Sequence, residues 1–222
     1  GDITDVFATN ASDDSTVAAS TINSTLSAGT NVVLQANNDI TVSTAITAAN
    51  AGGAGGTLTM QAGRSILINA NITTDDGALT LTANDTLANG VVDAQRDSGA
   101  AVITMKTSGS GTTINTGAGT FRATISAGAD KENDTSGDIT LDNVTAGALV
   151  VTNNGTEPGS DILGNGGGIL DIAGTSSFTT SVSNADITLD SANEFTGAVT
   201  LNTSGTGGHA VVDNGTTALD IA

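Results

Sequence analysis

Two short motifs that recur along the 222-residue sequence constrain its fold more than any other feature. The first reads Asp-Ile-Thr followed by an apolar residue and occupies 39–42, 138–141 and 186–189, with 65–68 as a variant. The second reads Gly, any residue, Leu or Val, Thr or Val, and an apolar residue, at 56–60, 77–81, 147–151 and 197–201. Apolar and polar residues alternate in both, so Ile40 and Val42 face one side and Thr41 the other, as in half-buried β-strands.

The spacing of these motifs predicts a β-solenoid. Ile40 to Ile66 spans 26 residues and Leu58 to Leu79 spans 21, so the period is loose. Turn-forming clusters such as 74–77 separate the strands, and no 3.6-residue pattern predicts a helix. We therefore expect an all-β parallel β-helix, with three short strands per coil of roughly 20–26 residues, and coils about 4.8 Å apart. An antiparallel sandwich or barrel is the alternative, but the two-residue hairpin signals it needs are sparse.

Stacking of equivalent strands predicts columns of side chains that run from coil to coil. The second motif gives a register in which one residue faces the core and the next faces solvent. The predicted inward column is Val32, Leu58, Leu79, Leu149 and Val199. The predicted outward column is Val33, Thr59, Thr80, Val150 and Thr200.

The composition fits a thin core and an exported chain. There is no Trp or Tyr and only four Phe, while the 37% hydrophobic residues argue against disorder. The net charge of −18 excludes nucleic acid and anionic membrane surfaces as natural partners. Cysteine is absent, as suits a chain that crosses a secretion pore unfolded. No apolar run is longer than four residues, as at 148–151, so we expect no membrane insertion. We expect residues 1–222 to form one continuous solenoid segment.

Several stretches resemble a known family. They are SAGTNVVLQA (27–36), GTLTMQAG (56–63), SILINA (65–70) and NEFTGAVTL (193–201). They resemble the repeat region of filamentous-haemagglutinin-like exoproteins, the secreted partners of two-partner secretion systems. The resemblance extends over most of the chain, although 86–137 fits it poorly.

This resemblance implies a right-handed parallel β-helix that is carried by an outer-membrane transporter and displayed or released at the bacterial cell surface. It also implies a cell-surface or glycan receptor as a partner. The secretion domain of the family carries Asn-Pro signatures, and this sequence has no Asn-Pro pair. The segment is therefore expected to be adhesin shaft, part of or stacked into a longer solenoid, and not the part that directs export.

No constellation of residues predicts catalysis. β-Helical polysaccharide lyases need clustered carboxylates and a basic residue that takes a proton. The basic residues are scattered in sequence, and His209 has no acidic neighbour before Asp213. We therefore expect no catalytic residues, no cofactor and no enzyme activity. The residues behind this prediction are Arg64, Arg96, Lys106, Arg122, Lys131 and His209.

Two acidic loops are the weak candidates for binding. Asp75 with Asp76, and Asp130 with Asp134, place carboxylates together and are possible calcium ligands, although solvated turns explain them as well. The glycine-bracketed stretch 128–137 carries the densest charge of the chain. We expect it to protrude from the coil between strands near Ile125 and Ile139, as a possible contact loop. Its central residues are Asp130, Lys131, Glu132, Asn133 and Asp134.

The sequence thus predicts a non-catalytic structural or adhesive β-helical shaft of a large extracellular protein. A self-assembling filament, sheath or matrix subunit is the alternative. Residues 218–222 joined to 1–4 read like 170–175, which would suit copies stacked end to end. Outward columns of Thr are also a feature of ice-binding solenoids, but Val33 and Val150 interrupt the columns of this chain.

Overall fold

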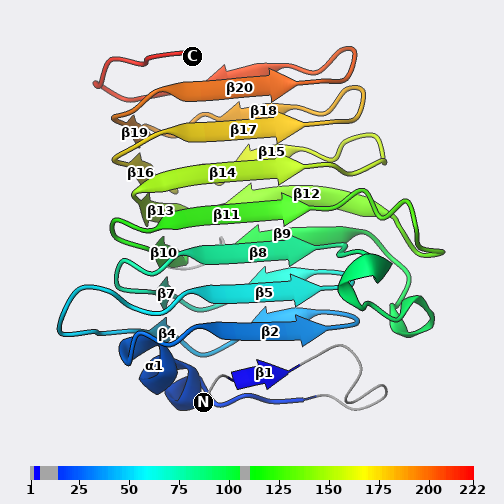
Figure 1. Cartoon of the computed structure of the whole chain (residues 1–222). Helices are drawn as coiled ribbons and strands as arrows, with labels where there is room; N and C mark the ends of the chain where they lie inside the picture. Colours follow the sequence, from blue (N-terminus) through cyan, green and yellow to red (C-terminus); the bar gives the residue numbers. More distant parts are fainter. Residues whose placement is uncertain (1–2, 6–14, 106–110) are drawn as a thin grey trace.

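The computed structural model describes residues 3–5, 15–105 and 111–222 and is a β-solenoid of about seven turns. Each complete coil places one strand in each of three sheets, and the paired strands of the described residues are parallel (Figure 1). The all-β, three-strand solenoid expected from the motif spacing is therefore confirmed.

Sheet 1 forms the front wall in Figure 1, and sheets 2 and 3 close the coil behind it. The strands of sheet 1 are β1 (Ile3–Asp5), β2 (Val32–Ala36), β5 (Leu58–Ala62), β8 (Leu79–Ala83), β11 (Thr120–Ile125), β14 (Ala148–Asn153), β17 (Ser176–Thr180) and β20 (Val199–Thr203). Those of sheet 2 are β3 (Ile40–Val42), β6 (Ile66–Ile68), β9 (Ala101–Met105), β12 (Ser136–Leu141), β15 (Ile162–Gly164), β18 (Ile187–Leu189) and β21 (Ala210–Val212). Those of sheet 3 are β4 (Ile46–Thr47), β7 (Ile72–Thr73), β10 (Thr113–Asn115), β13 (Asn143–Ala146), β16 (Leu170–Ile172) and β19 (Glu194–Phe195).

The register of sheet 1 confirms the predicted columns. The five residues of the predicted inward column are fully buried and occupy equivalent positions in successive strands. The structure adds Phe121 between Leu79 and Leu149, and Ser176 between Leu149 and Val199. From Val32 to Val199 the spacing between neighbours in this column ranges from 21 to 42 residues, so some coils exceed the expected 20–26 because their loops are longer.

The core is filled mainly by Leu, Ile and Val, as the lack of Trp and Tyr requires. Three of the four Phe also lie in it. The rings of Phe178 and Phe195 meet edge to face with centroids 5.9 Å apart. They fill the core of the solenoid near its carboxyl-terminal end. Phe121 belongs to the inward column of sheet 1.

A column of glycines lines the corner where sheet 3 passes into sheet 1. Each glycine lies two residues before the inward residue of a sheet 1 strand. Four of the six glycines are those of the second motif, and Gly119 and Gly174 occupy the same position in other coils. A Cβ at any of them would lie 2.0–2.6 Å from a backbone oxygen of the preceding coil. The close approach of the coils therefore excludes side chains here. The column is Gly56, Gly77, Gly119, Gly147, Gly174 and Gly197.

One helix contradicts the expectation that the chain has none. The helix α1 (Ala19–Ser27) packs against β4 at the amino-terminal end and buries Ile22 and Leu26, which lie one helical turn apart. The Asn23 Oδ1 atom accepts a hydrogen bond from the Thr47 N–H (2.8 Å), and the Ser27 Oγ atom accepts one from the Ala49 N–H (2.9 Å). The helix thus covers the core and satisfies donors along the edge of sheet 3.

The opposite end of sheet 3 is covered by one side chain. Asn214 is buried, and its amide accepts a hydrogen bond from the Phe195 N–H (2.7 Å) and donates to the Phe195 carbonyl (3.2 Å). It therefore occupies the place that a further strand would take beside β19. Nearby, Val211 and Ile221 remain 52% and 55% exposed. No helix in the described ranges is long and apolar enough to cross a bilayer.

Candidate functional site

Asp138 and Asp186 of the Asp-Ile-Thr motif, with Asp161 at the equivalent position before β15, form a ladder of hydrogen bonds along the entrance to sheet 2. The Asp138 Oδ1 atom accepts a hydrogen bond from the Asp161 N–H (3.0 Å) one coil later. Asp161 accepts from the Asp186 N–H and Asp186 from the His209 N–H, both at 2.7 Å. These carboxylates therefore fasten each coil to the next, although their charges repel. Partial burial raises the pKa of Asp138, and the negative charge of Asp161 acts in the same direction. The hydrogen bond from the Asp161 N–H opposes this shift but does not outweigh it.

The same ladder begins with an ion pair between Asp39 and Arg64. The Asp39 carboxylate accepts hydrogen bonds from Arg64 Nε (2.8 Å) and Nη2 (2.6 Å) and from the Ser65 N–H (2.9 Å). Burial alone would raise the pKa of Asp39, but these hydrogen bonds and the charge of Arg64 outweigh it and lower that pKa. This motif residue is thus a structural anchor.

The first calcium candidate pair is held by the backbone of neighbouring coils. Asp75 and Asp76 both have positive φ, at 53° and 66°. One Asp75 carboxylate oxygen accepts from the Asn50 N–H, and Asp76 Oδ1 accepts from the Ala118 N–H (2.6 Å). Each carboxylate therefore caps a different coil. Across the described ranges, no group of three His, Asp or Glu residues is placed to hold a metal ion.

The second candidate pair belongs to a feature that we call the lateral lobe, formed by residues 84–99 and 127–135. Both segments leave the stack at the corner between sheets 1 and 2, on the right in Figure 1. The first contains two short 3-10 turns, η1 (Leu87–Asn89) and η2 (Asp93–Gln95). The Asp130 Oδ2 atom accepts from the Leu87 N–H (3.1 Å), and the Asp134 carbonyl accepts from the Asn84 Nδ2 group (2.8 Å). These contacts join the two segments.

The lobe brings together three basic residues that are scattered in sequence. Arg96 Nε (2.7 Å) and Lys131 Nζ (3.0 Å) both donate to the carbonyl oxygen of Gly63, and Arg64 is the next residue along the chain. Lys131 also donates to the Asp85 carbonyl (2.5 Å). Arg96 and Lys131 are 3% and 8% exposed, and in the described structure neither has a carboxylate in salt-bridge contact. The Gly63 carbonyl is therefore the centre of a buried cationic cluster.

Burial changes the proton affinity of this cluster. Burial, followed by the charge of Arg96, lowers the pKa of Lys131 to about 8. Burial, followed by the charge of Arg64, also lowers the pKa of Arg96. Two oxygen atoms of the same lobe, Asn84 Oδ1 and Asp93 Oδ1, are buried and have no hydrogen-bond partner among the described residues. The lobe is therefore more polar inside than the coil that carries it.

These contacts show that part of the prediction for the contact loop was wrong. The segment leaves the coil as predicted, and Asp130 and Glu132 are exposed. Lys131, however, is buried and points into the lobe, and Asn133 Nδ2 donates to the Arg96 carbonyl (3.3 Å). Ser136 already belongs to β12, so the loop ends earlier than the sequence suggested. The sequence signal for the lateral lobe was the poor fit of 86–137 to the repeat, because this range contains residues of both lobe segments.

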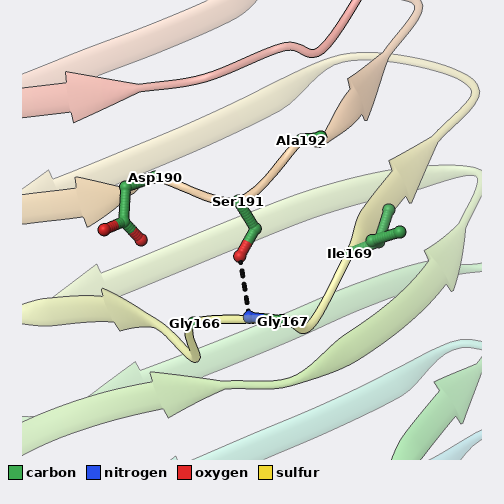
Figure 2. A pocket seen from close by; sticks show the side chains of 6 residues that line it. All are labelled: Gly166, Gly167, Ile169, Asp190, Ser191 and Ala192. Carbon is green, nitrogen blue, oxygen red and sulfur yellow. Dashed lines mark hydrogen bonds between the residues drawn. The ribbon is translucent and has the colours of Figure 1, made fainter.

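A shallow hollow lies at the corner between sheets 2 and 3, between the turns that follow β15 and β18. It measures about 370 Å³. Figure 2 shows the Ser191 hydroxyl beside the Gly167 N–H, from which it accepts a hydrogen bond (3.2 Å). Asp190 and Ile169 flank it, and no basic residue lines it, so it holds no acid–base pair. The lining residues are Gly166, Gly167, Ile169, Asp190, Ser191 and Ala192.

Of the remaining basic residues, His209 and Arg122 lie on different coils. His209 is exposed, and its Nδ1 atom lies 3.4 Å from Asp186 Oδ1, a neighbour that its sequence surroundings did not reveal. Arg122 is exposed on sheet 1, and Lys106 falls outside the described residues. No family model, curated protein or solved structure matches this chain at a significant level.

Proposed function

We propose that the chain is a non-catalytic shaft segment of a large secreted or surface-displayed bacterial protein, acting as a spacer, an adhesive surface or both. One observation carries the proposal: the residues that recur between coils serve the stacking of coils. The recurrent Asp accepts coil-to-coil hydrogen bonds, the recurrent Gly permits close approach, and the recurrent apolar residues fill the core.

The resemblance to filamentous-haemagglutinin-like repeats supports the same proposal and supplies its biological setting. Neighbouring repeats would continue the stack, and an outer-membrane transporter would carry the chain during export. A receptor, including a glycan, would meet the outer faces or the lateral lobe, because the coil interior is occupied by its own side chains.

Binding and turnover assays test this proposal together. Fluorescently labelled chain is added to bacterial and animal cells, and saturable binding is expected if the surface is adhesive. No binding by a stably folded chain would leave the spacer role alone. The same preparation is incubated with acidic polysaccharides, with and without calcium. Turnover that is lost in His209→Ala, or in a variant of the lobe cations, would overturn the proposal.

A self-assembling filament is the second candidate, and exposed apolar residues of the last coil support it. Leu219 and Ile221 are exposed near this end, and the exposed Val211 lies beside Thr188 on the outer face of sheet 2. The sequence comparison behind end-to-end stacking needs correction, however. Ile221 bridges to Val199 in sheet 1, whereas its supposed equivalent Ile172 lies in sheet 3.

Electron microscopy separates the two candidates. Seven coils about 4.8 Å apart make a stack of roughly 34 Å, so a single copy appears as a compact particle. Filaments that disappear in Ile221→Lys, but persist in the exposed-site control Asp190→Lys, would favour the assembly candidate. Compact particles at every concentration would reject it.

A further inference from the structure

From β2 to β20, the strands of sheet 1 lack the acidic residues that mark the rest of the chain. The sequence contains 23 Asp and Glu, yet none lies in the seven strands from β2 to β20 of this sheet. Arg122 is their only charged residue. By contrast, sheet 2 contains Asp138 in β12, and sheet 3 contains Asp171 in β16 and Glu194 in β19. A need for solubility alone does not explain why one sheet lacks Asp and Glu.

This face presents two regular columns of side chains that are uncharged except for Arg122. Residues along a strand that face the same way are about 7 Å apart, and coils repeat about every 4.8 Å. Figure 1 shows the strands in one broad, ordered wall. The first column is Val33, Thr59, Thr80, Arg122, Val150, Ser177 and Thr200. The second is Gln35, Gln61, Thr82, Thr124, Thr152, Thr179 and Asn202.

A second copy of the chain fits this face by both spacing and charge. Columns of β-branched and amide side chains with an identical repeat interdigitate when two sheets pack face to face about 10 Å apart. Two copies with a net charge of −18 repel each other, and repulsion is weakest where neither presents a carboxylate. Arg122 adds one exposed positive charge, without an ion pair in the described structure, against a negative partner.

The area of the face is sufficient for a weak pair. Seven strands span roughly 29 Å, and five residues per strand span roughly 17 Å. The face thus measures roughly 500 Å², and two copies would bury about 1,000 Å² together, near the lower limit for specific interfaces. We propose that two copies of this chain pair side by side through the outer face of sheet 1. This pairing does not depend on the shaft function and differs from stacking end to end.

Sedimentation velocity with two matched variants tests the pairing. Thr152→Asp places a carboxylate within the second column of the face, between Thr124 and Thr179. Thr140→Asp is the control, because Thr140 is equally half-buried and faces outward from sheet 2. Circular dichroism confirms that both variants fold. Wild type and Thr140→Asp should dimerise with the same dissociation constant, and Thr152→Asp should weaken dimerisation at least about tenfold.

Salt gives the second measurement. Raising NaCl from about 0.05 M to about 0.5 M should strengthen the dimer, because it screens repulsion between the two acidic copies. A wild type that stays monomeric up to about 1 mM overturns the proposal. So does an equal effect of the two variants. Assembly that Ile221→Lys abolishes and Thr152→Asp leaves unchanged would show stacking by the ends, and this also overturns side-by-side pairing.

Discussion

The glycine column at the corner between sheets 3 and 1 makes a sharp prediction for Gly174→Ala. A Cβ at this position would lie 2.3 Å from the carbonyl oxygen of Gly147, where ordinary contact begins at 3.4 Å. The obstructing atom belongs to the backbone, so no side chain can rotate away. The two coils must therefore separate by about 1 Å at this corner, or the backbone must bend.

The cost of this separation follows from the strands that it disturbs. Gly174 lies two residues before Ser176, and β17 is hydrogen-bonded on both sides, to β14 and to β20. Overpacking of this kind costs typically 1–3 kcal/mol and occasionally more, so we expect about 3 kcal/mol here. For a chain of this length, that loss lowers the melting temperature by roughly 6–12 °C.

Gly166→Ala is the matched control. A Cβ at Gly166 would meet nothing within 4 Å, and its φ lies outside the positive region that L residues rarely adopt. Alanine there restricts the unfolded chain and should be neutral or stabilising by up to about 1 kcal/mol. Thermal unfolding followed by circular dichroism compares the two variants. Melting temperatures within about 2 °C of each other would refute the close approach of coils at Gly174.

Three further predictions concern the core, the lobe and the end of sheet 3. Leu79→Asp should destabilise the chain by several kcal/mol because it buries an unpaired carboxylate, whereas Thr80→Asp should cost within about 1 kcal/mol in urea unfolding. Burial lowers the Lys131 pKa from 10.5 to about 8, so the folded state disfavours the charged form of Lys131. The melting temperature should therefore rise as the pH is raised from about 8 to 10.5, and Lys131→Met should flatten this rise. Asn214→Ala should cost about 1–3 kcal/mol and speed hydrogen exchange at the Phe195 amide; unchanged exchange would exclude the edge-covering role.

The period-two register of sheet 1 was predictable because a one-residue slip would move every apolar side chain to solvent. Leu58 and Leu79 fixed the inward column, and Thr59 and Thr80 fixed the outward one. The glycine of the second motif was visible as a repeat, but its role needed the distance between coils. The same holds for Asp161, whose acceptor function appears only once the next coil is in place.

The helix and the lateral lobe could not be predicted because their stabilising contacts lie far away in sequence. The helix α1 is rich in Ser and Thr, which are weak helix formers, and tertiary contacts of Ile22 and Leu26 with the core outweigh this local preference. Lys131 and Gly63 are 68 residues apart, so no local pattern shows that they meet. Charge density marked 128–137 as unusual but could not show that its lysine points inward.

The acidity of the chain takes on a different meaning once the coils are in place. A carboxylate that accepts a backbone N–H from the next coil needs an oxygen and not a charge, and Asn31 performs the same task for the Thr57 N–H (2.9 Å). Burial, and to a smaller extent the charge of Asp161, raises the pKa of Asp138, so the negative charge of Asp138 is a cost to stacking. Coil stability alone therefore does not explain why Asp and not Asn occupies these positions. Repulsion between neighbouring molecules would explain this choice, because it acts on every wall that carries carboxylates and leaves sheet 1 as the face open to a second copy.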